Sequence, residues 1–212
     1  MPQGAPSSPP LYNYFSADLK VESVNVNKNF DDDNHAAVVS SDLDAIADTL
    51  NQAGAEIVEW TKENGMVISA PKSSLTLFMP WTKQVNTQLP VSIDNVPVPT
   101  EKNPRLLGVT LDPLFTFSNH AAIIARKASS RLNIMMALAD SEFGNDKECL
   151  LMTFKVFIRS LFDFAALIVY PNYSPSSIHR LQLVQNSALR LALGCHMASS
   201  FNHLHKEALQ LT

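Results

Sequence analysis

The chain has 212 residues, enough for one domain or one and a half, and its 46% of apolar residues exclude a wholly disordered chain. Only 17% of residues are charged, below the usual value of about 25%, and the formal net charge is −4. Two cysteines are too few for a disulfide-stapled scaffold and favour a reducing compartment, cytoplasmic or nuclear.

The charge is unevenly distributed along the chain. Residues 1–104 hold 13 acidic and 6 basic residues, whereas residues 105–212 hold 7 acidic and 10 basic residues. This pattern fits a metal-binding carboxylate region beside a region that touches a polyanion. Two ordinary protein surfaces are the alternative that charge alone leaves open.

Neither secretion nor membrane insertion is expected. The Pro/Ser-rich residues 1–10 lack the basic and apolar regions of a secretory signal. The most apolar segment, 150–170, carries Lys155, Arg159 and Asp163 at four-residue spacing, which aligns them along one side of a helix. Because charges at the centre of a bilayer are costly, we expect a buried helix with its phenylalanines in the core, not a membrane helix.

Short elements are predicted over the first half of the chain. Residues 11–19 predict a helix, and residues 30–39 have the form of a hairpin with acids at its turn. A helix capped by Ser40 or Ser41 is predicted to continue to about Asn64, with Gly54 in its middle. Extended runs at 66–69 and 74–79, a hairpin over 91–98 and a strand over 106–111 follow.

Helices alone are predicted beyond residue 115. Ser118 or Asn119 is expected to cap the first, and Asp146 the second, which continues to Pro171. The third begins at Ser174-Pro175 and ends at Gly194, and a short amphipathic helix follows residues 199–200. The predicted class is therefore α+β, with short antiparallel strands and a helix over residues 1–115 and an all-helical bundle over 116–212.

The run Asp31-Asp32-Asp33 is the clearest candidate for chemistry. Neighbouring carboxylates can bind Mg²⁺, which is typically held by one or two carboxylates together with substrate phosphates. Two-metal phosphoryl transfer needs such a cluster, although a three-acid run by itself is more often a solvated loop.

Four motifs in order give this run a context. The chain opens with a form of P-Q-G-x-x-S-P-x-L-x-N, and Phe30 followed by three aspartates resembles a Y-x-D-D box. Residues 60–73 are similar to W-x-x-x-N-x-L-x-I-x-x-x-K-T, and residues 105–112 are similar to L-G-x-x-x-D. Together they resemble the reverse transcriptases of retrotransposons that lack long terminal repeats, the LINE type in its jockey-like group.

This resemblance implies a partial polymerase palm over 1–115 and a thumb-like helical region over 116–212. The family copies RNA into DNA with two Mg²⁺ ions, so an RNA template and a DNA primer are the implied partners. Asp32 and Asp33 would hold metal, Lys72 would lie near the pyrophosphate as an acid, and Gln3 and Gly4 would contact nucleotide and template. Leu107 and Gly108 would brace the primer end. Candidate phosphate contacts follow on the first thumb helix: Arg126, Lys127 and Arg131.

Departures from the family pattern point to a chain that is inactive by itself. The family's first catalytic aspartate precedes the P-Q-G motif, and no such strand stands before Pro2 in this sequence. We therefore expect polymerisation only with a complementing polymerase piece. Two alternatives stay open, a nucleic-acid-binding module and a helical protein-interaction module, both without catalysis.

Overall fold

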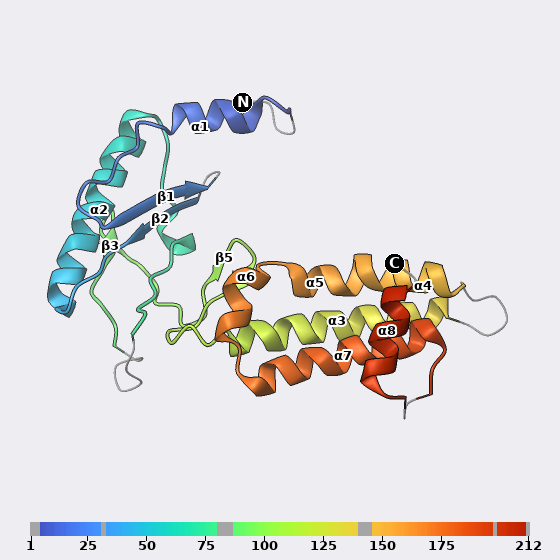
Figure 1. Ribbon diagram of the computed structural model, residues 1–212. Coiled ribbons are helices and arrows are strands. Elements are labelled where there is room, and N and C mark those ends of the chain that lie inside the picture. The colour runs from blue at the N-terminus through green and yellow to red at the C-terminus, as the bar shows by residue number, and fades with distance from the viewer. Residues whose placement is uncertain (1–4, 31–32, 80–86, 140–145, 197–198, 211–212) are drawn as a thin grey trace. The chain divides into compact units, whose positions relative to one another are not determined.

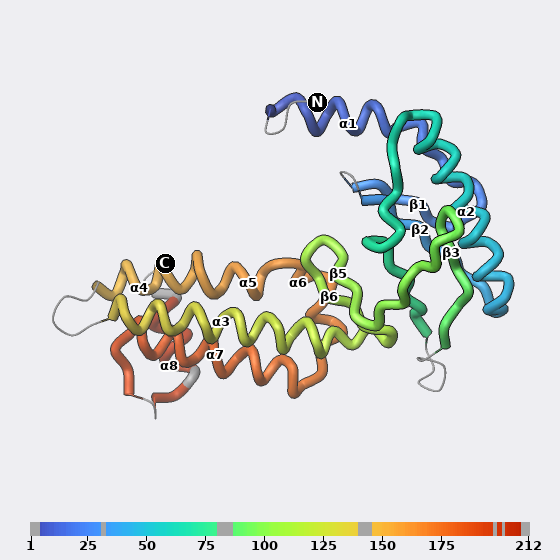
Figure 2. Tube along the Cα trace, turned by 180° about the vertical axis from the view of Figure 1, so that it is seen from behind, coloured from blue at the N-terminus to red at the C-terminus, as the bar shows by residue number. Residues whose placement is uncertain are grey.

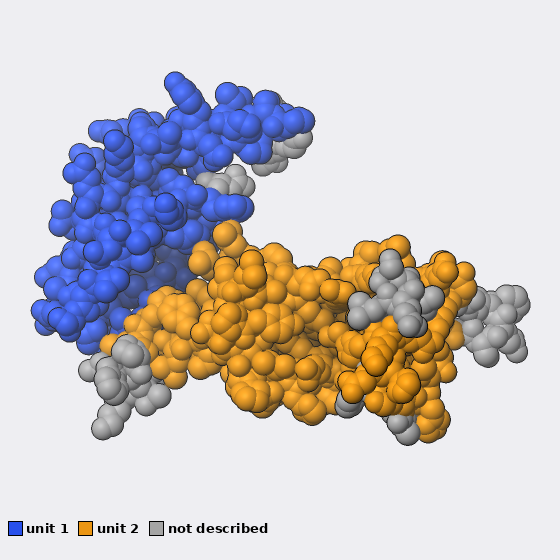
Figure 3. All heavy atoms as spheres, viewed as in Figure 1, with its two compact units in different colours: residues 1–77, 83–102 blue, residues 78–82, 103–212 orange. Residues whose placement is uncertain are grey.

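The computed structural model describes residues 5–30, 33–79, 87–139, 146–196 and 199–210. The chain divides into two compact units (Figures 1 and 3). Unit 1 consists of Met1–Leu77 and Lys83–Lys102, and unit 2 consists of Phe78–Thr82 and Asn103–Thr212.

Unit 1 begins with helix α1, Ser8–Phe15, which starts and ends earlier than predicted. Its two prolines lie in the first turn, where a missing N–H costs nothing. Phe15 packs edge-on against Trp60, with 5.9 Å between ring centroids, and the Trp60 indole donates a hydrogen bond to Asp18 at 3.1 Å. These contacts attach the N-terminal segment to the next helix.

The predicted acidic hairpin is confirmed in its strands. Strand β1, Val26–Phe30, pairs antiparallel with β2, Asp33–Ala37, and Phe30 lies opposite Asp33. On one face of the hairpin Asn34 donates its amide hydrogens to Asn27, at 2.8 Å, and to Asn29. Such cross-strand side-chain bonds help to fix the register of a two-stranded ribbon.

Helix α2, Leu43–Glu63, is capped by Asp42, whose carboxylate accepts the Asp44 N–H. The prediction of Ser40 or Ser41 as the cap was wrong by one or two residues. The chain packs close to Gly54, where a Cβ would lie 3.5 Å from the Ser92 carbonyl oxygen, an ordinary contact distance that leaves room for a methyl group. Asn51 holds the same segment, since its amide donates to the Pro90 carbonyl at 3.0 Å and its oxygen accepts the Ser92 N–H at 2.9 Å.

The extended runs predicted after α2 are not strands. Residues 66–69 have no regular structure, and in the second run only Leu75 forms an isolated bridge, to Thr100. The 3₁₀ turn η1, Ala70–Lys72, lies between them. The hairpin over 91–98 is confirmed as β3, Ser92–Ile93, and β4, Val96–Pro97, with Asp94 and Asn95 at positive φ as a two-residue turn requires.

Unit 2 starts with a hairpin where one continuous strand was predicted. Strand β5, Arg105–Leu106, pairs with β6, Val109–Thr110. Leu107 and Gly108 have φ values of 46° and 89°, so they form the turn between the strands. Gly108 is therefore a turn residue.

The rest of unit 2 is a helical bundle in which α3 and α7 lie side by side (Figures 1 and 2). Met135, Ile158 and Leu189 are among its fully buried side chains. The bundle consists of α3, Ser118–Leu138; α4, Lys147–Thr153; the π-helix η3, Phe154–Arg159; α5, Ser160–Asp163; α6, Ala166–Val169; the 3₁₀ turn η4, Tyr170–Asn172; α7, Pro175–Leu193; and α8, Phe201–Gln210.

The helix predicted up to Pro171 is interrupted. It begins as expected, with Asp146 accepting the Cys149 N–H, but it breaks at Phe164-Ala165, where Ala165 has a φ of 55°. The π-helix widens a turn and shifts the helical period, so Phe154 and Phe162 are buried whereas Phe157 and Phe164 are about half exposed. The prediction that all four phenylalanines lie in the core was wrong for the last two named.

Three other predicted helix boundaries can be compared with the structure. Ser174 accepts the Ser177 N–H at the start of α7, and Gly194 closes that helix at a φ of 63°, as predicted. The cap of α3 was predicted wrongly, because Phe117 occupies that position.

The α+β class is confirmed. Among the described residues, no helix is long and apolar enough to cross a bilayer.

Candidate nucleic-acid interface

The acidic hairpin of unit 1 presents one of its predicted metal ligands. Asp33 is the first residue of β2 and its side chain is exposed. Asp32, Gln3 and Gly4 lie outside the described residues. Within the part of the chain that the structure describes, no group of three or more His, Cys, Asp or Glu side chains is arranged to hold a metal ion.

Lys72 is the last residue of η1 and is exposed. Its backbone N–H donates to the Ser69 carbonyl at 2.9 Å, which closes the 3₁₀ turn. Among the described residues, no hydrogen bond or ion pair joins Lys72 to Asp33. Asp33 and Lys72, the two catalytic candidates of unit 1 that the structure describes, are thus both open to solvent.

The β5–β6 hairpin of unit 2 carries the two residues predicted to brace a primer end. Leu107 is 53% exposed at the tip of the turn. Gly108 lies against the Phe164 ring, and a Cβ built on it would approach that ring to 3.2 Å. The positive φ of Gly108 and this close approach both require glycine at the position.

His120 connects the hairpin to α3. Its side chain is 2% exposed, and its Nδ1 accepts the Thr110 N–H at 3.2 Å. Burial lowers the pKa of His120 below its ordinary value, and the positive charges of Lys127 and Arg105 lower it further. Lys127 on α3 and Arg105 on β5 therefore both act electrostatically on the same ring.

The three basic residues predicted on the first thumb helix differ in their surroundings. Arg126 and Lys127 are exposed. Arg131 is half-buried, and its guanidinium donates to the Phe157 carbonyl in the π-helix. One Arg131 donor is therefore occupied by the π-helix, whereas Arg126 and Lys127 present their charges to solvent.

Asp112, the last residue of the L-G-x-x-x-D segment, organises the loop that leads into α3. Its carboxylate accepts the Phe117 N–H at 2.6 Å, the Thr116 N–H at 3.0 Å and the Leu114 N–H at 3.3 Å. The Thr116 hydroxyl donates to it as well. The loop holds Phe115 and Phe117 at positive φ, a strained conformation that these hydrogen bonds maintain.

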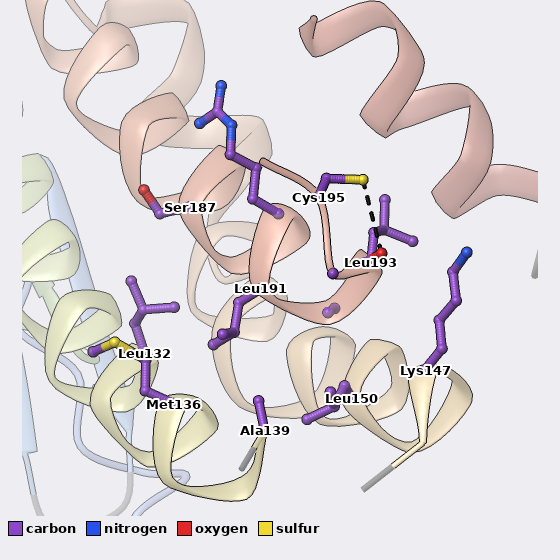
Figure 4. A pocket seen from close by; sticks show the side chains of 12 residues that line it. Leu132, Met136, Ala139, Lys147, Leu150, Ser187, Leu191, Leu193 and Cys195 are labelled. Carbon is purple, nitrogen blue, oxygen red and sulfur yellow. Dashed lines mark hydrogen bonds between the residues drawn. The ribbon is translucent and has the colours of Figure 1, made fainter. Parts of the chain in front are cut away.

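A separate pocket of about 670 Å³ opens at the other end of the bundle, between α3, α4 and α7 (Figure 4). Its lining is mostly apolar and includes Leu132, Met136 and Leu191. Lys147 at its rim is paired with Glu207 of α8. Cys195 lies beside it, with its thiol donating to the Leu193 carbonyl at 3.8 Å.

Sequence reasoning missed His120, Arg105 and the role of Asp112. A signal for His120 existed, because it lies on the helical face that Ala121, Ile124 and Ala128 define as buried. No signal in the sequence indicated that Arg105 and Lys127 would act on one imidazole ring, since that depends on how the hairpin lies against α3.

Comparisons with known proteins provide evidence on the class of this chain from its sequence. No family model matches the chain, and no solved structure is significantly similar to it. Sequence similarity to a curated polymerase supports the class that the four motifs indicate, a reverse transcriptase of the LINE type. That polymerase is the probable RNA-directed DNA polymerase from transposon X-element of Drosophila melanogaster. It is 27% identical over 98% of this chain, and the chain spans about a quarter, 23%, of its length.

Proposed function

We propose that the chain contributes to RNA-directed DNA synthesis as part of a LINE-type reverse transcriptase. The observation that carries the proposal is the similarity over 98% of the chain, together with the four motifs that the sequence contains in order. Residues 1–115 then correspond to part of the palm and residues 116–212 to the thumb-like region. The template is RNA and the primer is DNA.

The β5–β6 hairpin and α3 hold the nucleic-acid backbone in this proposal. Arg105 is the first residue of β5, and Leu107 projects at the tip of the hairpin. Arg126 and Lys127 are exposed neighbours on α3. Cations that meet phosphates give affinity without sequence choice, as a polymerase needs. Arg131 is assigned a structural role instead, because it binds the Phe157 carbonyl.

Asp32 and Asp33 are the proposed Mg²⁺ ligands. The exposed position of Asp33 at the end of a tight hairpin fits a hydrated cation, and Mg²⁺ bound there would neutralise phosphate charge during nucleotidyl transfer. Lys72 is the proposed acid near the pyrophosphate. One adjacent pair of carboxylates is less than a two-metal site needs, so the 212 residues by themselves are expected to bind Mg²⁺ weakly and not to extend a primer.

Binding is tested by titrating the chain with a fluorescent RNA–DNA duplex at several salt concentrations. The logarithm of the affinity should fall linearly with the logarithm of the salt concentration, and Lys127→Ala should reduce that slope by about 0.9. Arg159→Ala is the matched control, because Arg159 is paired with Asp163 at 3.4 Å and should leave the slope nearly unchanged. Affinity that does not depend on salt would favour the protein-interaction alternative.

Catalysis is tested by primer extension with and without a complementing piece that carries the family's first aspartate strand. We expect no extension by the chain alone and extension by the mixture. The Asp33→Asn variant should abolish the extension by the mixture. Extension by the chain alone that survives Asp33→Asn would contradict the assignment of the metal ligands.

A further inference from the structure

The β5–β6 hairpin depends on the bundle for its position. Each strand has two residues, and the pairs are Arg105 with Thr110 and Leu106 with Val109. A two-stranded ribbon of this size is not stable alone in water. Contacts with the bundle therefore decide where the hairpin lies: those of Val109 and Thr110, which are both buried, and the close approach of Gly108 to the Phe164 ring.

His120 supplies the hydrogen bond at that contact. It lies in the first turn of α3, and its Nδ1 accepts the buried Thr110 N–H at 3.2 Å. An imidazole nitrogen accepts only when it carries no proton, so the ring is neutral with its proton on Nε2. A protonated ring would turn Nδ1 into a donor that faces the Thr110 N–H.

The surroundings of the ring oppose protonation. Burial, Lys127 from α3 and Arg105 from β5 all lower the pKa of His120, and β6 contributes no ionisable side chain. The two cations are the ones assigned to nucleic-acid backbone under the proposed function.

We propose that neutral His120 is the positioning residue that holds the β5–β6 hairpin on α3, and that protonation of this one ring releases the hairpin from the nucleic-acid interface. The part of this inference that concerns nucleic acid rests on the proposed function. The part that concerns the hairpin is a property of the chain itself and is tested without a ligand.

The test compares two variants of the full chain. His120→Asn keeps an acceptor near the position of Nδ1 but cannot be protonated, and His120→Leu keeps an apolar side chain of similar size without an acceptor. Hydrogen exchange of the ¹⁵N-labelled chain is followed by NMR and expressed as protection factors, which remove the intrinsic effect of pH. The amide of Ala188, in the buried core of α7, reports whether the bundle stays folded.

In the native chain, Thr110 protection should fall about tenfold between pH 7.5 and the acid side of the His120 titration, while Ala188 protection is retained. His120→Leu should lose about tenfold of Thr110 protection at both pH values, and His120→Asn should retain protection at both. Equal Thr110 protection in the native chain and His120→Leu would overturn the proposal. A fall with acid that persists in His120→Asn would overturn it as well.

Duplex affinity of the same variants separates the two claims. If His120→Leu loses duplex affinity and His120→Asn keeps it, the hairpin position matters for binding. If the native chain does not bind duplex, the proposed function fails, while the exchange data still decide the hairpin contact. If duplex binds equally to all three chains although Thr110 protection differs, the release of the hairpin from the interface is refuted.

Discussion

Asp112 offers a direct test of how the loop before α3 is held in place. The Asp112→Ala change removes the acceptor for three backbone N–H groups and for the Thr116 hydroxyl. The Phe117 N–H is partly buried, so losing its partner costs about 1 kcal/mol. The bonds from Leu114 and Thr116 are exposed, and because water replaces them in part, they add about 1 kcal/mol together.

The expected loss is therefore about 2 kcal/mol in the free energy of unfolding. With a urea dependence of about 2 kcal/mol per molar for a small unit, the unfolding midpoint should fall by about 1 M. Urea unfolding followed by far-ultraviolet circular dichroism measures this shift, since helices of the bundle dominate the signal. Asp112→Asn keeps one carbonyl acceptor and should lose about half as much.

Thr116→Val is the control for the hydroxyl alone and should cost less than 1 kcal/mol, about the value of one exposed hydrogen bond. A midpoint for Asp112→Ala that equals that of the native chain would show that the loop does not depend on this carboxylate. The strained φ values of Phe115 and Phe117 would then need another source of support.

Three further changes test the packing and the electrostatics. Gly54→Ala should raise the free energy of unfolding by about 0.5–1 kcal/mol, because the added Cβ meets the Ser92 oxygen at an ordinary 3.5 Å and alanine favours a helix. A lower thermal unfolding temperature would mean that β3 cannot accept the methyl group. Met135→Ala in the fully buried core should cost about 2–5 kcal/mol in urea unfolding, and a much smaller cost would show that the bundle closes the cavity. Because the pKa of His120 is lowered in the folded state, the unfolded chain binds more protons between that lowered pKa and 6.5. The free energy of unfolding should therefore fall as the pH drops below about 6.5 and should level off below the folded pKa. His120→Asn should reduce this dependence on pH.

Local sequence patterns correctly predicted those turns and helix ends that are stabilised by residues close by in the chain. The Asp94-Asn95 turn, the Asp146 cap, and the Ser174-Pro175 start of α7 with its Gly194 end all depend on atoms within a few positions in the chain. Spacing alone placed them correctly. The α+β class and the order of the four motifs follow from the same kind of short-range information.

Sequence reasoning failed where a distant partner decides the conformation. The predicted strand at 106–111 is a hairpin because Thr110 is bound by His120 and Gly108 lies under Phe164. The long helix breaks at Ala165, next to the ring that covers this hairpin. Helical periodicity cannot register such contacts, because it describes one segment at a time.

The candidate interface divides in the same way. From the sequence by itself, Arg126, Lys127 and Arg131 are three equivalent cations on one helix, and His120 is one more residue of its buried face. The tertiary structure separates them, because the Phe157 carbonyl takes up Arg131 while Arg105 joins Lys127 around His120. The physical reason is that the interaction between two charges depends on the distance between them. The fold sets that distance when the charges lie on different elements, and their spacing along the sequence does not predict it.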